Sequence, residues 1–295
     1  VAAVNTGASL DIVEGFNPRD VMVACENERC TARDGVPTIF IGILEYPLFD
    51  RVYFSALRTC IMDGSVCPES LMKRAAEDMN LTEITNVYGF TESSPGMTQT
   101  HRDEEFKRRF STVGRAMPGV EVKVADPETC IELPYGTPGE IMCKGYNVMK
   151  GYYNMPEETA RAITPDGWLH SGDLGIMDED GYLVITGRIK DMIIRGGENI
   201  YPREVEEFIS GIEGVMDVQV VGTPSQKYGE EVVAFVIPRP GADLTPEDVR
   251  DSCRGKIAWH KIPKFVALVE AFPLTASGKV KKFELRQMAA EMFSS

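Results

Sequence analysis

The chain has 295 residues, enough for about two domains that each bury a core of their own. Hydrophobic residues make up 43% of it and charged residues 26%, ordinary values for a globular protein that exclude a disordered or fibrous chain. The formal net charge of −14 disfavours binding to nucleic acid or to an anionic membrane surface. A polyphosphate ligand would therefore need a local basic or backbone-amide site.

Seven scattered cysteines, none of them in a CxxC pair, predict reduced thiols and a cytoplasmic protein. The longest apolar stretch, residues 36–44, contains a proline and a glycine and is shorter than the roughly 20 residues that a membrane span requires. We therefore expect no transmembrane segment. The first ten residues hold neither a methionine nor a basic-then-apolar leader, so we expect the chain to begin within a longer protein.

The first part of the chain alternates helices and strands. The Asn-Pro pair at 17–18 predicts a capped helix, and a second helix is expected over residues 67–79. Residues 57–62 and 84–88 are expected to form strands that each run into a glycine-containing turn. This alternation predicts a mostly parallel α/β sheet, and ligands favour the carboxyl ends of such strands.

Two further patterns follow along the chain. Short strands separated by turns predict a small β-barrel or meander, and mixed strands and helices after it predict an α+β domain. The expected elements are, in order, strands at 120–124, 139–143, 168–170, 174–177 and 182–186, a helix at 202–209, strands at 215–221 and 231–237, a helix at 246–256 and a last helix from residue 282. We therefore expect an α/β part (1–113), a β-barrel-like subdomain (114–189) and a mobile α+β domain (190–295).

The segment Tyr88-Gly89-Phe90-Thr91-Glu92 ends a predicted strand and is the first candidate site. Gly89 lets the backbone approach a ligand, and the Thr91 hydroxyl can donate to a phosphate oxygen. The Glu92 carboxylate can hold magnesium on bridging phosphate oxygens. Taken alone, the same residues also fit a strand-to-loop turn with a solvated glutamate.

Asp173 and Arg188 form the second candidate site. A carboxylate is suited to gripping two vicinal ribose hydroxyls, and a nearby arginine could hold that carboxylate or the sugar. The alternative is a structural ion pair beside a turn. The three histidines, His101, His170 and His260, have no carboxylate or serine partner that suggests a catalytic triad, so we expect them to be structural.

A Gly-Lys loop at residues 273–279 is the third candidate site, directly before the last predicted helix. It lacks the paired glycines and the following Ser or Thr of a Walker loop, which excludes a P-loop NTPase. Lys279 would instead be a mobile point charge, suited to negative charge that develops in a transition state. The alternative is an ordinary solvated lysine.

In order and spacing, these segments resemble the adenylate-forming superfamily of acyl-CoA synthetases, luciferases and peptide-synthetase adenylation domains. The resemblance runs from about residue 13 to 288 and includes three further motifs, Gly139-Glu140-Ile141, Gly151-Tyr152-Tyr153-Asn154 and Gly196-Gly197-Glu198-Asn199-Ile200-Tyr201-Pro202. It implies that an acid and ATP form an acyl-adenylate and pyrophosphate, after which CoA displaces AMP. Magnesium would be the cofactor, and the partners would be small molecules.

The resemblance also implies which residues hold the nucleotide. They are, for adenine, Tyr88 (stacking), Asn86 (amino edge) and Gly64, Ser65 and Gly89 (lining); for ribose, Asp173 with Arg188 beside it; and for phosphate and magnesium, Thr91 and Glu92.

Lys279 matches the catalytic lysine of the superfamily, which bridges the carboxylate and the α-phosphate; Thr91 and Glu92 complete the implied catalytic set. Lys190 falls at the hinge position. Rotation about it could present first Lys279 and then the thioester-step loop Gly196-Gly197-Glu198 to one cleft.

The motif at 196–202 and the run Gly35-Val36-Pro37-Thr38 favour a medium-chain fatty acid as substrate. The phosphate loop that precedes these segments in the superfamily is absent, which indicates N-terminal truncation, and exposed surfaces left by it could make the chain a homo-oligomer. Two alternatives stay open. One is an adenylation domain that loads a carrier protein, and the other is a non-catalytic remnant that binds nucleotide or acyl-CoA.

Overall fold

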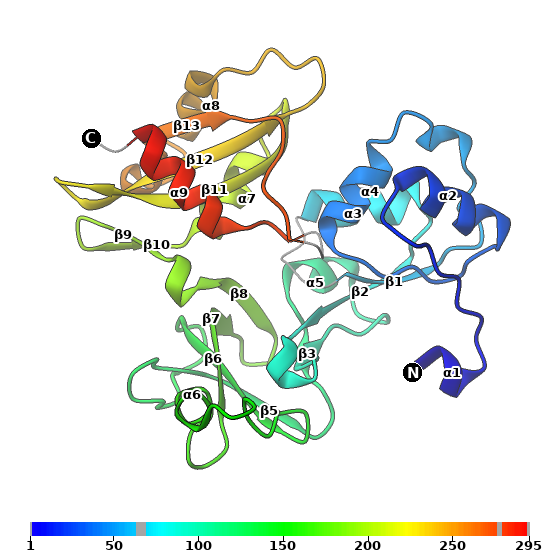
Figure 1. Ribbon diagram of the computed structural model, residues 1–295, viewed down its shortest axis with the longest axis horizontal. Coiled ribbons are helices and arrows are strands. Elements are labelled where there is room, and N and C mark those ends of the chain that lie inside the picture. The colour runs from blue at the N-terminus through cyan, green and yellow to red at the C-terminus, as the bar shows by residue number, and fades with distance from the viewer. Residues whose placement is uncertain (1, 63–68, 276–278, 294–295) are drawn as a thin grey trace.

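The structure is a computed structural model that describes residues 2–62, 69–275 and 279–293. Figure 1 shows three groups of elements. The α/β lobe runs from α1 to β4, the meander lobe from β5 to β8, and the C-terminal lobe from β9 to α9. Each lobe has its own sheet.

The α/β lobe packs short helices around a four-stranded sheet of order β1-β2-β3-β4. The pair β1 and β2 is parallel, as predicted, and β3 and β4 extend it in antiparallel fashion. The elements are α1 (Ala2–Thr6), α2 (Pro18–Asn27), α3 (Pro37–Leu44), β1 (Thr59–Met62), α4 (Glu69–Asp78), β2 (Glu83–Tyr88), β3 (Thr98–Gln99), α5 (Phe106–Ser111) and β4 (Arg115–Ala116), with 3₁₀ helices at Phe49–Arg51 and Thr91–Ser93.

Two helices of this lobe show how far local sequence determines structure. The predicted cap of α2 is confirmed, because the Asn17 side chain accepts a hydrogen bond from the backbone N–H of Arg19 at 3.0 Å. Helix α3 was not predicted. Its run is apolar on nearly every side, so it shows no amphipathic period. Phe40 and Ile43 are fully buried in the core of the lobe, which is why this helix needs no polar face.

The meander lobe is an antiparallel four-stranded sheet of order β5-β6-β7-β8, so the chain forms the meander that the sequence predicts. The two strands expected at 168–170 and 174–177 are one strand, whose pairing shifts register on both sides. The elements are β5 (Val120–Ala125), β6 (Gly139–Gly145), α6 (Pro156–Ala162), β7 (Leu169–Met177) and β8 (Leu183–Arg188).

The C-terminal lobe places helices on both faces of a five-stranded sheet. Along β12, alternate residues face opposite sides, so Val232 and Ala234 pack with α7 and α8 while Val233 and Phe235 pack with α9. The elements are β9 (Ile193–Arg195), β10 (Glu198–Ile200), α7 (Pro202–Ser210), β11 (Val215–Ser225), β12 (Gly229–Pro238), α8 (Pro246–Cys253), β13 (Phe265–Leu268) and α9 (Lys282–Phe293), with 3₁₀ helices at Ile189–Asp191 and Trp259–Lys261.

Polar contacts join the C-terminal lobe to both of the other lobes. Arg239 of the C-terminal lobe binds Glu45 of the α/β lobe at 3.1 Å, and Arg203 of α7 donates to the carbonyl of Ile185 in β8. Within the described ranges, no helix has both the length and the apolar composition that crossing a membrane requires.

Candidate active site

The centre of the candidate site is the Asp173 carboxylate, which two side chains hold from different elements. The hydroxyl of Tyr88, the last residue of β2, donates to Oδ2 at 2.8 Å. Nε of Arg188, the last residue of β8, donates to Oδ1 at 2.9 Å. Asp173 lies directly opposite Arg188 in the β7–β8 pair. The structure thus brings the first and second candidate sites together, where the α/β lobe meets the meander lobe.

The three members of this cluster differ in burial. The Asp173 side chain is 8% exposed, whereas that of Arg188 is 54% exposed. Burial raises the pKa of Asp173 above its ordinary range, against the opposing effects of Arg188 and the Tyr88 hydroxyl. Burial, together with the negative charge of Asp173, also raises the pKa of Tyr88. Tyr88 therefore stays a phenol that donates to the carboxylate.

The position of Tyr88 bears on its implied role. The residue is 7% exposed and belongs to the hydrophobic core of the meander lobe, and its hydroxyl is engaged by Asp173. The described geometry therefore makes Tyr88 a residue that positions the carboxylate. Adenine stacking on its ring stays a prediction.

Asn86 lies two residues earlier on β2, opposite Met62 of β1. Its Nδ2 donates to the backbone carbonyl of Thr112 at 3.2 Å, and the residue is buried. Because Nδ2 is used within the protein, the implied contact with the adenine amino group falls to the side-chain carbonyl oxygen, which is an acceptor. The implied lining residues Gly64 and Ser65 lie outside the described residues.

Glu92 is on the 3₁₀ helix Thr91–Ser93, with Thr91 exposed beside it. Its Oε1 accepts a hydrogen bond from the hydroxyl of Tyr152 at 2.8 Å, and this bond is the main cause that raises the pKa of Tyr152. Tyr152 had no predicted role, although it belongs to the motif Gly151-Tyr152-Tyr153-Asn154. Nothing in the local spacing shows that residue 152 would meet residue 92.

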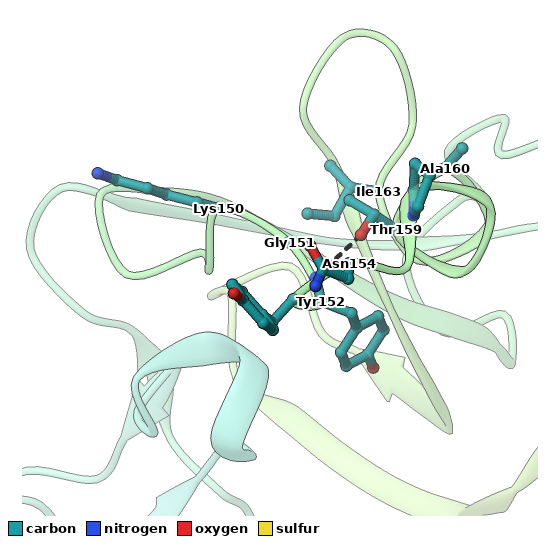
Figure 2. A pocket seen from close by; sticks show the side chains of 9 residues that line it. Lys150, Gly151, Tyr152, Asn154, Thr159, Ala160 and Ile163 are labelled. Carbon is teal, nitrogen blue, oxygen red and sulfur yellow. Dashed lines mark hydrogen bonds between the residues drawn. The ribbon is translucent and has the colours of Figure 1, made fainter.

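Tyr152 also lines a surface pocket of about 550 Å³ (Figure 2). The Thr159 hydroxyl accepts a hydrogen bond from the backbone N–H of Tyr152 at 2.9 Å, drawn as the dashed line in Figure 2. The lining residues run from Lys150 to Ile163. Because the lining includes no member of the Asp173 cluster, this pocket is separate from the centre of the candidate site.

The chemistry of Glu92 fits a magnesium ion that is bound chiefly by a nucleotide. Magnesium in such sites takes one or two carboxylates and completes its shell with phosphate oxygens and waters. Among the described residues, no group of three or more His, Cys, Asp or Glu side chains could hold a metal ion without such help. Glu92 could therefore supply one carboxylate oxygen.

Three of the implied site glycines have a structural reason to be glycine. A Cβ on Gly89 would lie 1.6 Å from the carbonyl oxygen of Pro95, so no other residue fits there. Gly196 and Gly197 form the two-residue turn between β9 and β10, with φ values of +62° and +89°. Glu198, which follows them, is exposed. The implied role of this turn in thioester formation stays a prediction.

Lys279 is exposed, and among the described residues no hydrogen bond or ion pair joins it to the Asp173 cluster. Its backbone N–H donates to the Thr275 hydroxyl at 3.1 Å, and its carbonyl accepts from the Thr275 N–H at 2.8 Å. Within the described part of the chain, its ammonium group forms no ion pair. The described residues that follow β13, up to residue 275, extend away from its sheet toward the α/β lobe (Figure 1).

Lys190, the implied hinge residue, is exposed on the short 3₁₀ helix that joins the meander and C-terminal lobes. Arg286 of α9 donates to its carbonyl at 3.2 Å and forms an ion pair with Asp191. One arginine of the C-terminal lobe thus binds the Lys190 carbonyl and the side chain of the next residue, Asp191.

The expectation that no histidine has a carboxylate partner is wrong. Nδ1 of His170 lies 2.8 Å from Oε2 of Glu140. The two residues are 30 positions apart, on the neighbouring strands β6 and β7. The register of that antiparallel pair places them together, and no short-range sequence pattern reports such a register.

Comparisons with known proteins match both ends of the chain. The family described as "AMP-binding enzyme" matches residues 1–153, and the family "AMP-binding enzyme C-terminal domain" matches residues 204–279. YngI of Bacillus subtilis is 50% identical over 294 residues, which are 100% of this chain and 54% of that protein. The mitochondrial medium-chain acyl-CoA ligase ACSF2 of Mus musculus is 39% identical over 272 residues, covering 92% of this chain and 44% of that protein. The chain thus spans about half the length of the curated relatives it matches.

Among solved structures, ATP-bound MatB from Rhodopseudomonas palustris superposes with a TM-score of 0.90 at 34% identity, over 98% of this chain and 56% of that chain. The apo form of the same protein gives 0.73, also at 34% identity and 98% coverage of this chain. Because the protein compared is the same, the difference concerns the arrangement of the chain, and the arrangement here is nearer to the ATP-bound form. The buried Asp173 cluster and these matches agree, and the chain belongs to the AMP-binding enzyme family, the adenylate-forming enzymes that its motifs resemble.

Proposed function

We propose that the chain carries the nucleotide site and the movable catalytic lysine of an AMP-forming acyl-CoA ligase. In the first step a carboxylate would attack the α-phosphate of ATP, giving an acyl-adenylate and pyrophosphate. In the second, the thiol of CoA would attack the acyl carbon and release AMP. The observation that carries this proposal is the buried Asp173 carboxylate, fixed by Tyr88 and Arg188 at the junction of two lobes.

Asp173 is suited to the ribose of ATP because its orientation is set before any ligand arrives. Each carboxylate oxygen already accepts one hydrogen bond and keeps a further lone pair for a sugar hydroxyl. Both steps use the same adenosine, so this contact would serve both. Arg188, more exposed than its partner, would hold the carboxylate and face the sugar.

The phosphates would lie toward Thr91 and Glu92, at the other end of the segment that begins with Tyr88. Magnesium bound there would neutralise charge on the phosphate oxygens. Glu92 would supply a carboxylate oxygen to it. Tyr152, bonded to Oε1 of Glu92, would orient that carboxylate.

Lys279 would meet the negative charge that forms on the α-phosphate in the first step. The nearness of this chain to ATP-bound MatB, with TM-scores of 0.90 against 0.73 for the apo form, supports an arrangement that suits the first step. Rotation about Lys190 would then replace Lys279 with the Gly196-Gly197-Glu198 turn for the second step. The cores of the C-terminal lobe are separate from that of the meander lobe, which supports the boundary between the proposed domains 114–189 and 190–295. The boundary to the proposed domain 1–113 is supported by the separate sheets of the α/β and meander lobes.

For the acid we propose a fatty acid of medium chain length, supported by the 39% identity to a ligase named for medium-chain acyl groups. A reducing, cytoplasmic compartment is proposed because Cys25, Cys30, Cys130, Cys143 and Cys253, five of the described cysteines, form no disulfide. Exposed apolar side chains before α2, such as Leu10 and Ile12 at 72% and 79%, support self-association.

The direct test is acid-dependent exchange between pyrophosphate and ATP, measured over short, medium and long fatty acids, benzoate and coumarate. We expect exchange to be greatest with a medium-chain acid. A full-length member of the family serves as positive control, and calorimetric binding of a non-hydrolysable acyl-adenylate analogue is measured in parallel. Binding without exchange would favour the non-catalytic alternative, and transfer to a carrier protein but not to CoA would favour the carrier-loading alternative. The absence of both binding and exchange would contradict the proposal.

Asp173→Asn should weaken the analogue's binding by about 10- to 100-fold if Asp173 holds the ribose. Asp180→Asn is the matched control, because Asp180 is an exposed aspartate of the same lobe that pairs with Arg108. Equal binding by the two variants would remove Asp173 from the site.

A further inference from the structure

A second cluster of reactive side chains lies on the meander lobe and shares no residue with the Asp173 cluster, although its Glu140 accepts the N–H of Gly172, the residue before Asp173. Sγ of Cys130 is 3.7 Å from Nε2 of His170, and Nδ1 of His170 is 2.8 Å from Oε2 of Glu140. A thiol, an imidazole and a carboxylate therefore follow one another at contact distance. This is the order of nucleophile, base and orienting group that activates cysteine in enzymes.

The buried carboxylate of Glu140 fixes the orientation of the base, His170. The Glu140 side chain is 4% exposed, and its second oxygen accepts the backbone N–H of Gly172 at 2.9 Å. With both oxygens engaged, the carboxylate cannot turn away from His170. It accepts the Nδ1 proton, which leaves Nε2 as the acceptor that faces the Cys130 thiol.

The nucleophile is held as firmly as the base. Cys130 lies in the loop between β5 and β6, where its N–H donates to the carbonyl of Asp126 at 2.9 Å and its own carbonyl accepts from Nζ of Lys123 at 2.9 Å. The residue is partly exposed, and the His170 side chain is 23% exposed. A small molecule can therefore reach the sulfur while the imidazole stays beside it.

Another thiol provides a control within the chain. Cys30 is also partly exposed, but its Sγ donates to the carbonyl of Ala24 at 3.8 Å. Among the described cysteines, the other four, Cys25, Cys60, Cys143 and Cys253, are buried. In the described part of the chain, the imidazole contact therefore distinguishes Cys130 from a thiol of similar exposure.

We propose that Cys130 is a reactive site that undergoes thiol–disulfide exchange with low-molecular-weight disulfides, with His170 as its base and Glu140 as the residue that positions the base. Nε2 of His170 takes the thiol proton, and the thiolate attacks one sulfur of the disulfide. The S–S bond of the small molecule breaks as a new S–S bond to Cys130 forms, and the departing thiolate takes the proton from His170. One disulfide is consumed and one is made, so no separate oxidant is needed. This inference does not depend on the proposed ligase activity.

The test measures modification of each cysteine by dithiodipyridine, a neutral disulfide, with mass mapping of the labelled peptides over time. Cys67 lies outside the described residues, so all variants carry Cys67→Ser. We expect Cys130 to react on the order of 10-fold or more faster than Cys30, and His170→Asn to remove about that factor while the rate at Cys30 stays the same. His101→Asn, at an exposed histidine, is the matched control and should change neither rate.

Folding is checked in the same experiment, because Cys143 and Cys253 must stay unlabelled in an intact chain. If His170→Asn exposes them, Glu140→Gln replaces it, since Gln can still accept the Gly172 N–H. If both variants unfold, the comparison of Cys130 with Cys30 in the unchanged chain decides. Equal rates at the two cysteines, or a fast Cys130 that does not depend on His170 or Glu140 in a folded variant, would overturn the proposal.

Discussion

The Asp173 cluster and the Lys279 segment belong to one candidate site but are built in opposite ways. In the cluster, a buried carboxylate has a partner on each oxygen, and one of those partners is itself buried. Lys279 is exposed, and in the described part of the chain only its backbone groups are bonded. A two-step reaction on one nucleotide needs both kinds of group. The contact common to both steps can be fixed in advance, whereas a group used in one step must be free to leave.

The largest effect expected from this contrast is at Lys279. Lys279→Ala should slow adenylation on the order of 10²–10³-fold, the usual cost of losing one preorganised donor to a transition state. Thioester formation from a supplied acyl-adenylate should stay within about twofold, because the lysine has left the site by then. Pyrophosphate exchange measures the first step and thiol consumption the second. Lys256→Ala, at another exposed lysine of the lobe, is the control, and equal loss in both steps would show that Lys279 does not move.

Substitution of Asp173, unlike that of Lys279, should impair both steps. Asp173→Asn removes the charge but keeps one acceptor oxygen, so we expect ATP and AMP to bind about 10- to 100-fold more weakly, with a loss in both steps. Tyr88→Phe should also weaken nucleotide binding, but by a smaller factor, since it removes one of the two groups that orient the carboxylate. Calorimetry with each nucleotide measures the affinities. A loss confined to one step would mean that Asp173 is not the fixed part of the site.

Local sequence predicts the parts of this site whose residues lie close together along the chain, and not the contacts between distant residues. The end of β2 at Tyr88 and the segments with Asp173 and Arg188 were predictable, because strand ends and glycine-containing turns leave signals within a few residues. The Tyr88–Asp173 bond joins residues 85 positions apart. This bond depends on how two lobes dock. Only the resemblance to a family indicated that Tyr88 and Asp173 lie at one nucleotide site.

The contact between Glu140 and His170 was missed for the same reason. In the β6–β7 pair Glu140 lies opposite Leu174 and His170 opposite Met142, with a shift of register between them. Residue spacing alone does not choose this register from the several that are possible. Helix α3 was missed for a different reason. Its residues are buried on several sides, so the run has the composition of a core segment without the period of a surface helix.

If the lobes have separate cores, a substitution in the C-terminal lobe should change the stability of that lobe without changing the affinity for ATP. Asp217 of β11 tests this, because burial raises its pKa to about 6, against the opposing hydrogen bond from the Val218 N–H and with a smaller raising effect of Glu206. A carboxyl with a raised pKa in the folded state supports folding below its ordinary pKa of 3.8 and loses that contribution as the pH rises through about 6.

Asp217→Asn should therefore be more stable than the unchanged chain by roughly 3 kcal/mol at pH 8 and by well under about 1 kcal/mol at pH 4. Urea unfolding followed by Trp259 fluorescence in a Trp168→Phe background measures this, since these are the only tryptophans of the sequence. Asp251→Asn is the exposed control. A gain that is equal at both pH values would assign the effect to something other than the Asp217 charge, and a change in ATP affinity would show that the lobes are coupled.

The smallest effect is expected at the contact between the fixed and the movable parts. Arg239 binds Glu45 at 3.1 Å, with side chains 45% and 29% exposed. Partial burial acts to raise the pKa of Glu45, but the Arg74 hydrogen bond and the charges of Arg74 and Arg239 outweigh it and lower that pKa, so the pair is charged at neutral pH. A contact this exposed contributes less than about 1 kcal/mol. Because it joins the lobes in an arrangement near the ATP-bound form, that small energy should favour the first step over the second.

Arg239→Gln should therefore lower the ratio of the adenylation rate to the thioester rate by about two- to fourfold, without changing the affinity for ATP. Added salt should produce the same shift in the unchanged chain, because it screens exposed charges, and should have little further effect on the variant. Arg250→Gln is the control, since the ion pair of Arg250 within the described residues is with Glu247 of the same helix. A ratio that neither the substitution nor the salt alters would mean that this contact forms without biasing the rotation. The proposed hinge at Lys190, whose carbonyl Arg286 binds, would then carry the whole preference.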